Sequence, residues 1–286
     1  AFEGSRIARA ELTGSKLTDF DFRGARLADV GDPQGLRGAT ITLEQLLSQA
    51  ELQTRIDRKY LAVTGAVPTL LGTADADLRV LSIAGRRRFA YRSTYFDTPE
   101  LDAFLLAGRG RRRRFKVRTR VYRDSGEAWL EVKTRGPRGT TVKDRMPYDL
   151  ADASRLTTVG LDFIAATLAA QEVFGVDVAA LQPTLHTGYD RSTLLVSSRT
   201  SDQVSRATID SNLVWRRPGS EHSLATPGSV IIETKGGATA SAIDRALWYS
   251  GVRPSCVSKY GAGLAALGED LPELKWRRAL NQLNPE

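Results

Sequence analysis

Positively charged side chains recur at every second position between residues 112 and 120: Arg112, Arg114, Lys116, Arg118 and Arg120. Successive side chains of a β-strand point to opposite faces, so a strand here would place these cations on one face over roughly 27 Å, at about 3.3 Å per residue. Like charges held this close repel one another, which predicts a polyanionic ligand between them. The next alternating segment adds Glu131 and Lys133. Cations interleaved with a carboxylate suit a phosphate chain and its metal ion.

The positive charge of the chain is concentrated in one region. The chain carries a net charge of +8 at pH 7, whereas residues 86–145 contain 18 Lys or Arg and 7 Asp or Glu, a local net charge of +11 that leaves −3 for the remainder. This asymmetry indicates a site. Nucleic acid, an acidic membrane and polyphosphate-like ligands all remain open at this level. A solvated basic patch or a nucleic-acid contact would explain residues 111–114 alone, but the alternation through Arg120 favours a specific site.

Length and composition fit a folded protein with a substantial core. The chain has 286 residues and is 41% hydrophobic, which suits one large domain or one domain with an appendage. No apolar run approaches the length of a membrane span, and the N-terminus lacks a signal-peptide pattern. Cys256 is the only cysteine, so an internal disulfide is excluded and a reducing cytoplasmic location is expected.

The N-terminal residues show a period of five. Its apolar positions are Phe2, Ile7, Leu12, Leu17, Phe22 and Leu27. This pattern resembles pentapeptide-repeat proteins, which implies a short right-handed β-helix over residues 1–41; a chance period in a polar leader is the alternative. Thr42 and Gln45 form a capping-box pair, which predicts a linker helix over residues 42–53.

The remaining residues, 54–286, predict an α+β domain with many antiparallel strands. Turn sequences at residues 124–126 and 136–139 join neighbouring strands as hairpins. Strands are predicted at 55–63, 92–96, 112–123, 127–134, 140–149, 183–198, 204–215 and 229–235, and helices at 154–174, 240–249 and 262–267. This pattern favours a closed antiparallel β-barrel or a sandwich, with helices outside.

The order and local contexts of the charged segments resemble the VTC domain. That domain is the catalytic module of the vacuolar transporter chaperone polyphosphate polymerase and belongs to the triphosphate tunnel metalloenzymes. The matching segments are Arg58–Tyr60, Tyr95–Thr98, Lys116–Arg120, Trp129–Lys133, Lys143–Arg145, Tyr189–Arg191, Arg206–Asp210, Glu233–Lys235 and Ser258–Tyr260. The resemblance covers about residues 55–267 and implies an antiparallel β-barrel, the triphosphate tunnel, with external helices.

The resemblance also implies roles for individual residues. It implies catalytic phosphate contacts for Lys59, Arg118, Arg120 and Lys133. It implies further phosphate binding by Arg114, Lys116, Lys143, Arg145, Arg191, Arg206, Lys235 and Lys259. Glu233 matches the glutamate that holds a divalent metal, Mn²⁺ or Mg²⁺, and Glu131 is a second candidate ligand. For Glu131, a role as counter-ion that holds the cations apart is an equal alternative.

Two positions depart from the pattern of the family. The wider superfamily begins with Glu-x-Glu-x-Lys, where this chain has Arg55, Asp57 and Lys59. Loss of the first carboxylate weakens a two-metal hydrolase interpretation and favours the polymerase branch. The earlier lysine of the C-terminal basic pair falls at Cys256, so that phosphate contact is not matched here.

Three functions follow as hypotheses. The first is an ATP-dependent polyphosphate polymerase, which transfers the γ-phosphate of ATP to a growing inorganic polyphosphate chain in a cationic, metal-dependent tunnel. The second is a hydrolase of tripolyphosphate or a nucleoside triphosphate, and the third is a non-catalytic polyphosphate or inositol-phosphate sensor. The expected partners are ATP and polyphosphate, and not nucleic acid. Coupling to polymer translocation would need a membrane-protein partner, and the repeat would mediate homo-oligomer assembly.

Overall fold

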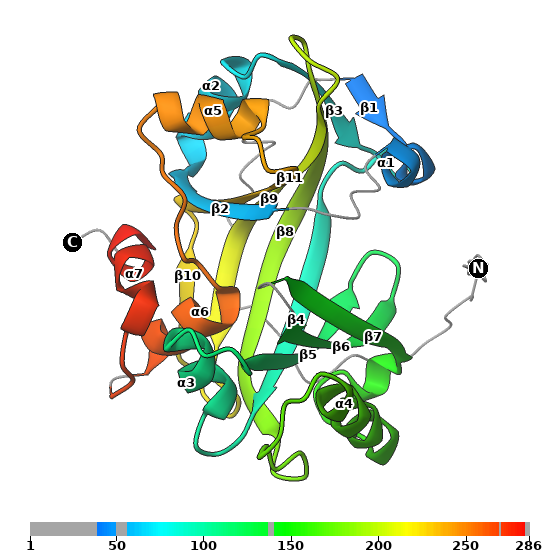
Figure 1. The fold of residues 1–286 in the computed structure, drawn as a ribbon, viewed down its shortest axis with the longest axis vertical. Coiled ribbons are helices and arrows are strands. Elements are labelled where there is room, and N and C mark those ends of the chain that lie inside the picture. The colour runs from blue at the N-terminus through cyan, green and yellow to red at the C-terminus, as the bar shows by residue number, and fades with distance from the viewer. Residues whose placement is uncertain (1–38, 50–55, 137–139, 269, 284–286) are drawn as a thin grey trace.

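The computed structural model describes residues 39–49, 56–136, 140–268 and 270–283, which form one large sheet with helices around it (Figure 1). The predicted β-helix lies outside these residues except for β1 (Ala39–Ile41), which pairs in parallel with β3 (Ala76–Leu81). Helix α1 (Leu43–Gln49) follows. The backbone N–H groups of Thr42 and Gln45 each donate to the other residue's side chain at 3.2 Å, which confirms the capping box. The domain boundaries at 41 and 53 stay predictions.

The main path of the sheet is antiparallel throughout. Its order is β2-β11-β9-β8-β4-β5-β6-β7. The strands on this path are β2 (Ile56–Val63), β11 (Ser229–Gly236), β9 (Val204–Arg216), β8 (Gln182–Ser198), β4 (Phe89–Asp97), β5 (Phe115–Tyr122), β6 (Glu127–Arg135) and β7 (Thr141–Tyr148). Off this path, β3 pairs with β8, and β10 (Ser223–Thr226) pairs with β9.

The prediction of a closed barrel is wrong for the part of the chain that the structure describes. Strands β2 and β7 lie at the two ends of the path, and no pairing joins them there. In Figure 1 the long strands β8 and β9 form the back, with β2 and β5–β7 in front of them. Strand β7 exposes every second residue, including Lys143 and Arg145. Charged side chains on an edge strand oppose pairing with another strand, which accounts for the open edge.

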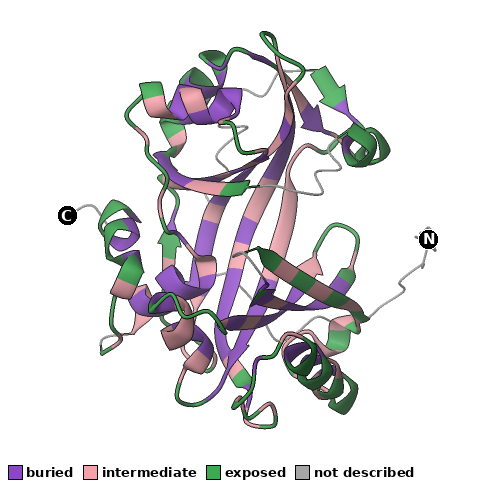
Figure 2. Ribbon diagram, in the orientation of Figure 1, coloured by how far each residue is buried: buried purple, intermediate pink, exposed green. Residues whose placement is uncertain are grey.

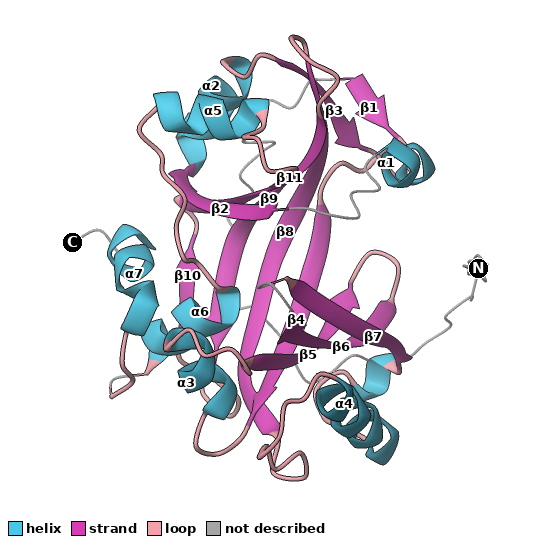
Figure 3. Ribbon diagram, viewed as in Figure 1, coloured by secondary structure: helices cyan, strands magenta, loops and turns pink. Residues whose placement is uncertain are grey.

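Helices surround the sheet (Figure 3). They are α2 (Val67–Gly72), α3 (Asp102–Gly108), α4 (Thr158–Ala170), α5 (Ala242–Tyr249), α6 (Lys259–Leu267) and α7 (Arg277–Leu283). The largest core cluster joins α3, α6 and α7 to the sheet and includes Phe104, Trp215 and Tyr260. A second cluster packs α2 and α5 against the strands and includes Tyr60 and Ile232. In Figure 2 the long central strands are largely buried, whereas the outer face of α4 is exposed.

Most of the predicted strands and helices are confirmed. One boundary matters for the site, because the basic strand predicted at 112–123 begins only at Phe115. Gly110 has a φ of +68°, which suits glycine and turns the chain after α3. Arg112 therefore lies in a loop and does not share the strand with Lys116 and Arg118. The short elements α2, α3, α7, β3 and β10 were not predicted. No helix among the described residues is long and apolar enough to cross a membrane.

Candidate functional site

The strand register arranges charged residues in rows across β5, β6 and β7. Three rows follow one another: Lys116–Lys133–Lys143, Arg118–Glu131–Arg145 and Arg120–Trp129. Residues two apart on a strand share a face, so all three rows lie on the same face of the sheet. The alternation seen in the sequence therefore becomes a two-dimensional array of cations with one carboxylate inside it.

The same face continues across the other strands of the path. The cross-strand neighbours are Tyr95 with Arg118, Tyr91 with Tyr189, Arg191 with Asp210, Lys235 with Arg206, and Lys59 with Glu233. We call these residues, together with the three rows, the cationic face. Every residue that lies on a strand and was predicted to bind phosphate thus belongs to this one surface.

The cationic face curves so that β2 and β5 come close to each other. Lys59 on β2 and Lys116 on β5 are separated by four strands along the sheet. Nevertheless the charge of Lys59 helps to lower the pKa of Lys116, after burial and Arg118, to about 7. Hydrogen bonds give the same arrangement, because the N–H of Ser255 donates to the carbonyl of Lys59 at 2.7 Å and the ammonium of Lys116 donates to the hydroxyl of Ser258, three residues further on. The sheet is therefore curved but open, in place of the closed tunnel expected from the sequence.

Glu131 is fully buried within the array. The Nε and Nη2 atoms of Arg118 donate to one carboxylate oxygen at 2.7 and 2.5 Å, and the ammonium of Lys143 lies 3.2 Å from the other. Burial alone would raise the pKa of Glu131, but Arg118, Arg120 and Lys143 outweigh it and hold the pKa below its usual range. With both oxygens engaged by cations, the geometry favours the counter-ion role over the metal-ligand role.

Glu233 is more accessible and lies between two lysines. Its carboxylate is 3.3 Å from the ammonium of Lys59 and 2.8 Å from that of Lys235, and 12% of the side chain is exposed. Burial opposes ionisation, but Lys59 and then Lys235 hold the pKa of Glu233 well below its usual value. One ionised carboxylate fits the way in which Mg²⁺ is bound together with substrate phosphates. The described residues contain no cluster of three or more His, Cys, Asp or Glu that would hold a metal alone.

A second buried carboxylate, Asp210, fixes the cations at the centre of the face. Arg191 donates to its two oxygens at 2.6 and 2.8 Å, and Lys259 forms an ion pair with it. Burial would raise the pKa of Asp210, but Arg191 and Lys259 hold it at about 2. Lys259 also lies 4.4 Å from the ring centroid of Tyr189, which stacks on Tyr91. These contacts hold both cations in defined positions.

Other cations on this face have no such counter-charge. Within the described parts of the chain, Lys116, Lys133 and Arg120 form no ion pair with a carboxylate. Arg118, then burial and Arg120, lower the pKa of Lys133 well below its usual value. Lys116 donates to the hydroxyl of Ser258 at 3.0 Å. The repulsion among these groups is therefore only partly offset inside the protein, by Glu131.

Several buried polar atoms of the face also lack a hydrogen-bond partner in the described structure. They are Nε of Arg120 and the hydroxyl groups of Ser93, Thr187, Tyr189 and Thr208. The strand register places the side chains of these residues on the cationic face. Buried polar groups are normally hydrogen-bonded. An anionic ligand with many oxygen atoms would accept hydrogen bonds from these donors and would pair with the neighbouring cations.

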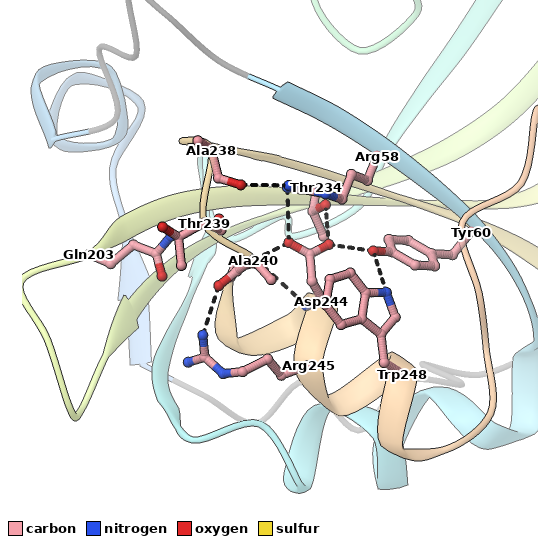
Figure 4. Close-up of polar contacts among 11 residues, drawn as sticks. Arg58, Tyr60, Gln203, Thr234, Ala238, Thr239, Ala240, Asp244, Arg245 and Trp248 are labelled. Carbon is pink, nitrogen blue, oxygen red and sulfur yellow. Dashed lines mark hydrogen bonds and ion pairs between the residues drawn. The ribbon is translucent and has the colours of Figure 1, made fainter.

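A buried network on the opposite face supports β2 and β11 (Figure 4). Asp244 accepts hydrogen bonds from the hydroxyl groups of Tyr60 and Thr234, both at 2.6 Å. It also accepts one at 2.7 Å from the backbone N–H of Ser241, in the capping box that begins α5. The guanidinium of Arg58 lies 3.6 Å from the same carboxylate. The network thus joins both strands to the first turn of α5.

The Asp244 network positions residues of the cationic face indirectly. Tyr60 flanks Lys59 on β2, and Thr234 flanks Glu233 on β11. Neighbouring residues of a strand point to opposite faces. The hydrogen bonds of Tyr60 and Thr234 to Asp244 therefore fix the two strands from the opposite face of the sheet. In this way they orient Lys59 and Glu233. The indole N–H of Trp248 donates to the Tyr60 hydroxyl at 3.1 Å, which ties α5 to the same point.

Some predicted residues lie at the margin of the face. Arg145 is exposed on the edge strand and lies 4.4 Å from the ring centroid of Trp129. Arg114 precedes β5 by one residue, and its Nη1 donates to the carbonyl of Arg111 at 3.0 Å. Cys256, which stands where the family pattern has a lysine, is an exposed free thiol.

Sequence reasoning did not assign site roles to Asp210, Asp244 or Ser258. Asp210 had a signal, because it closes the Arg206–Asp210 segment that was matched to the family. Asp244 had a weaker sequence signal, because it forms a capping-box pair with Ser241. Ser258 caps α6, and only the folded chain brings it to Lys116.

Comparison with protein families matches residues 54–268 to the VTC domain. No curated protein sequence matches the chain. Among solved structures, HpAC1 from Hippeastrum, described as revealing a dominant triphosphatase activity, is 14% identical over 77% of this chain and 98% of its own, with a TM-score of 0.43. The structural genomics target VpR19 from Vibrio parahaemolyticus is 12% identical over 70% of this chain and 87% of its own, with a TM-score of 0.36. The PH1819 protein from Pyrococcus horikoshii OT3 is 11% identical over 69% and 86%, with a TM-score of 0.33.

Proposed function

The chain belongs to the VTC domain family, and we propose that it is an ATP-dependent polyphosphate polymerase. In this reaction a terminal oxygen of the polyphosphate chain attacks the γ-phosphorus of ATP. The bond from that phosphorus to the β,γ-bridging oxygen breaks, and ADP leaves with the electron pair. The observation that carries the proposal is the continuous cationic face, on which Lys116, Lys133 and Arg120 form no ion pair within the described structure.

The residues of this face suit the reaction because phosphoryl transfer depends mainly on positioning and charge stabilisation. Arginine offers a planar fork for two phosphate oxygens, and lysine a movable point charge. We assign the contacts to the transferred phosphate to Lys59, Arg118, Arg120 and Lys133. Glu131 orients Arg118 for this role through two hydrogen bonds. The rest of the chain and the nucleotide phosphates would be held by Arg114, Lys116, Lys143, Arg145, Arg191, Arg206, Lys235 and Lys259.

Glu233 is the residue that would hold a divalent metal, Mn²⁺ or Mg²⁺, jointly with phosphate oxygens of the substrate. A bound metal would offset negative charge on those oxygens. Lys59 and Lys235, which flank Glu233 in the absence of ligand, can turn toward phosphate when the metal engages the carboxylate. Glu131 keeps its role as the counter-ion of Arg118 and Lys143.

Two observations favour transfer to a polymer over hydrolysis of a small anion. The cationic face extends from β2 to β7, which offers many more cations than one triphosphate can engage. The position of the first carboxylate of the wider superfamily is Arg55 in this chain, which favours the polymerase branch.

The proposal is tested by incubating the full chain with ATP and Mn²⁺ or Mg²⁺ and resolving the products on a gel stained for polyphosphate. A polymerase yields a ladder of polyphosphate chains with ADP in step. Release of orthophosphate without polymer would instead identify a hydrolase. Binding of polyphosphate with no consumption of ATP would identify a binding module.

A further inference from the structure

A hollow lies on the C-terminal segment, beyond the last residue matched to the VTC domain. Its volume is about 520 Å³, and it is lined by Leu274, Lys275, Arg277, Arg278, Asn281 and Gln282. The segment consists of the short 3-10 helix η4 (Leu274–Trp276) and α7. Arg277 is paired with Glu273 at 3.4 Å, so Lys275 and Arg278 are the cations of the lining with no carboxylate partner in the described structure. The hollow therefore has a cationic and amide-rich wall.

The C-terminal segment packs against the rest of the domain through buried contacts. Trp276 is 1% exposed, and its ring centroid lies 4.9 Å from that of Phe104 on α3. A Cβ atom placed on Gly261 of α6 would come within 2.1 Å of the Trp276 ring, so only glycine permits this approach. The ammonium of Lys275 donates to the carbonyl of Ala107 at the end of α3. The position of the hollow is thus set by buried contacts.

The hollow adjoins the cationic face at the start of β5. The last cross-strand pair of β5 and β6 at this end is Phe115 with Thr134, so Arg114 and Arg135 follow it side by side. The charges of Arg114 and Arg135 act on Lys275, whose pKa is lowered first by burial and then by these neighbours. Lys275 and Arg114 in turn act on Lys116, in the first row of the face. Hydrogen bonds give the same order, because Lys275 and the N–H of Gly110 both donate to the carbonyl of Ala107, and Arg114 donates to that of Arg111. Cations therefore follow one another from Lys116 through Arg114 to the hollow.

The chemistry of this path indicates its ligand. In the described residues, no carboxylate pairs with Arg114, Arg135 or Lys275, so their charges are available to a polyanion. The lining of the hollow contains no aromatic side chain, and Trp276 is buried. Proteins that bind single-stranded nucleic acid stack the bases on exposed aromatic rings, which this surface lacks. A ligand made only of phosphates needs no such ring.

We propose that the hollow, with Arg114, Arg135 and Lys275, is a second binding site for inorganic polyphosphate. It holds the part of the chain that extends past the transfer site, and it engages only chains longer than a triphosphate. The inference rests on the proposed function for its ligand, but it concerns binding and can be tested without turnover.

The test measures the affinity of the full chain for tripolyphosphate and for long-chain polyphosphate by titration calorimetry. The variant is K275A/R278A, which removes the two cations of the hollow that lack a carboxylate partner. The matched control is R199A, which removes an exposed arginine, paired with Asp77 at 2.9 Å, in the turn between β8 and β9. We expect the double variant to bind long-chain polyphosphate about tenfold more weakly and tripolyphosphate with unchanged affinity. R199A should bind both ligands as the parent does.

An unchanged affinity for long-chain polyphosphate would overturn the inference, and so would an equal loss for both ligands. A loss seen with single-stranded DNA but not with polyphosphate would assign the hollow to nucleic acid and also overturn it. Melting curves and the single variant R278A show whether a loss comes from the fold. Failure of the polymerase proposal would appear separately, as absence of polymer from the parent chain with ATP.

Discussion

Lys116 on β5 and Lys133 on β6 lie directly opposite each other in the antiparallel ladder. Like charges in this arrangement destabilise a sheet, and here the row is extended by Lys143 on β7. Burial and then Arg118 lower the pKa of Lys116, whereas Arg118 and then burial lower that of Lys133, and Glu131 offsets the lowering of the second only in part. A phosphate chain bound on this face would supply the missing negative charge.

Replacing Lys133 with alanine should abolish most turnover without unfolding the protein. Removal of one group that stabilises transition-state charge lowers the rate by about a hundredfold or more. The melting temperature should stay the same or rise, because the substitution relieves repulsion from Arg118, Arg120 and Lys116. Initial rates and melting curves measure both effects, and Lys133→Arg should restore part of the rate. A variant with a normal rate, or one that fails to fold, would count against the role of Lys133.

Glu131→Gln should act chiefly on stability. Breaking a buried ion pair leaves the partner charge uncompensated, at a cost of about 3–5 kcal/mol. Arg118 would be that partner, since both of its hydrogen bonds to the carboxylate would lose their charge. Denaturant unfolding measures the free energy of unfolding directly. A stable variant with a changed metal requirement would restore Glu131 as a metal ligand.

Glu233→Gln should show the opposite pattern. Lys59 and Lys235 hold the pKa of Glu233 well below its usual value, so its charge stabilises the fold, but the side chain is partly exposed and the loss in free energy of unfolding should be smaller than for Glu131→Gln. Activity should need a much higher concentration of Mn²⁺ or Mg²⁺, because the amide lacks the negative charge that a hard cation requires. Rates measured across a metal titration test this. If the variant and the parent respond alike to metal, the ligand lies elsewhere.

Binding of a phosphate chain should take up protons above pH 7. In the unliganded protein the pKa of Lys116 is about 7, lowered by burial and then by Arg118 and Lys59, so at pH 8 the amine is mostly neutral. A polyanion favours the ammonium form and raises this pKa, so binding at pH 8 draws a proton from solution. Lys116 is already charged well below pH 7, where its uptake should vanish.

The proton uptake is measured by calorimetry with tripolyphosphate in two buffers that differ in ionisation enthalpy. Net uptake at pH 8 that declines toward pH 6 agrees with the assignment of Lys116. Net release at pH 8 would contradict it. Lys116→Gln should remove part of the uptake, since glutamine cannot titrate.

Tyr60→Phe should loosen the support behind Lys59 and Glu233. The lost hydroxyl removes one hydrogen bond to Asp244, which keeps those from Thr234 and Ser241, and it leaves the indole N–H of Trp248 without its partner, at a cost of about 1–3 kcal/mol. Tyr249→Phe is the matched control, because this tyrosine ends α5 and is 91% exposed. Urea unfolding of both variants provides the measurement. Equal stability of the two variants would show that the Asp244 network contributes little.

Much of the sheet could be predicted because its signals are local. Alternation from Lys116 to Arg120 and from Trp129 to Lys133 sets both the strands and the shared face, and Asp124–Gly126 sets the hairpin that fixes their register. The rest depends on contacts between distant parts of the chain. The curl that brings Lys59 near Lys116 and the ion pairs of Asp210 have no counterpart in sequence spacing.

The errors have the same origin. The strands, the hairpins and the family resemblance predict a closed barrel, with a sandwich as the alternative, but closure depends on whether β2 and β7 meet, and the charged edge of β7 opposes pairing. Lys275 was overlooked because it lies in a segment without a motif. Lys275 comes close to Arg114 only because Trp276 packs against Phe104, a contact between distant parts of the chain.

The central claim is that the cationic face moves the γ-phosphate of ATP onto polyphosphate. The most direct measurement gives the full chain ATP labelled at the γ-phosphate, and in parallel ATP labelled at the α-phosphate, with Mn²⁺, and follows the label into polymer. The account predicts label in polyphosphate from γ-labelled ATP alone, in amounts that match the ADP formed, and almost none with Lys133→Ala. Label recovered only as orthophosphate, or polymer labelled from the α-phosphate, would contradict it.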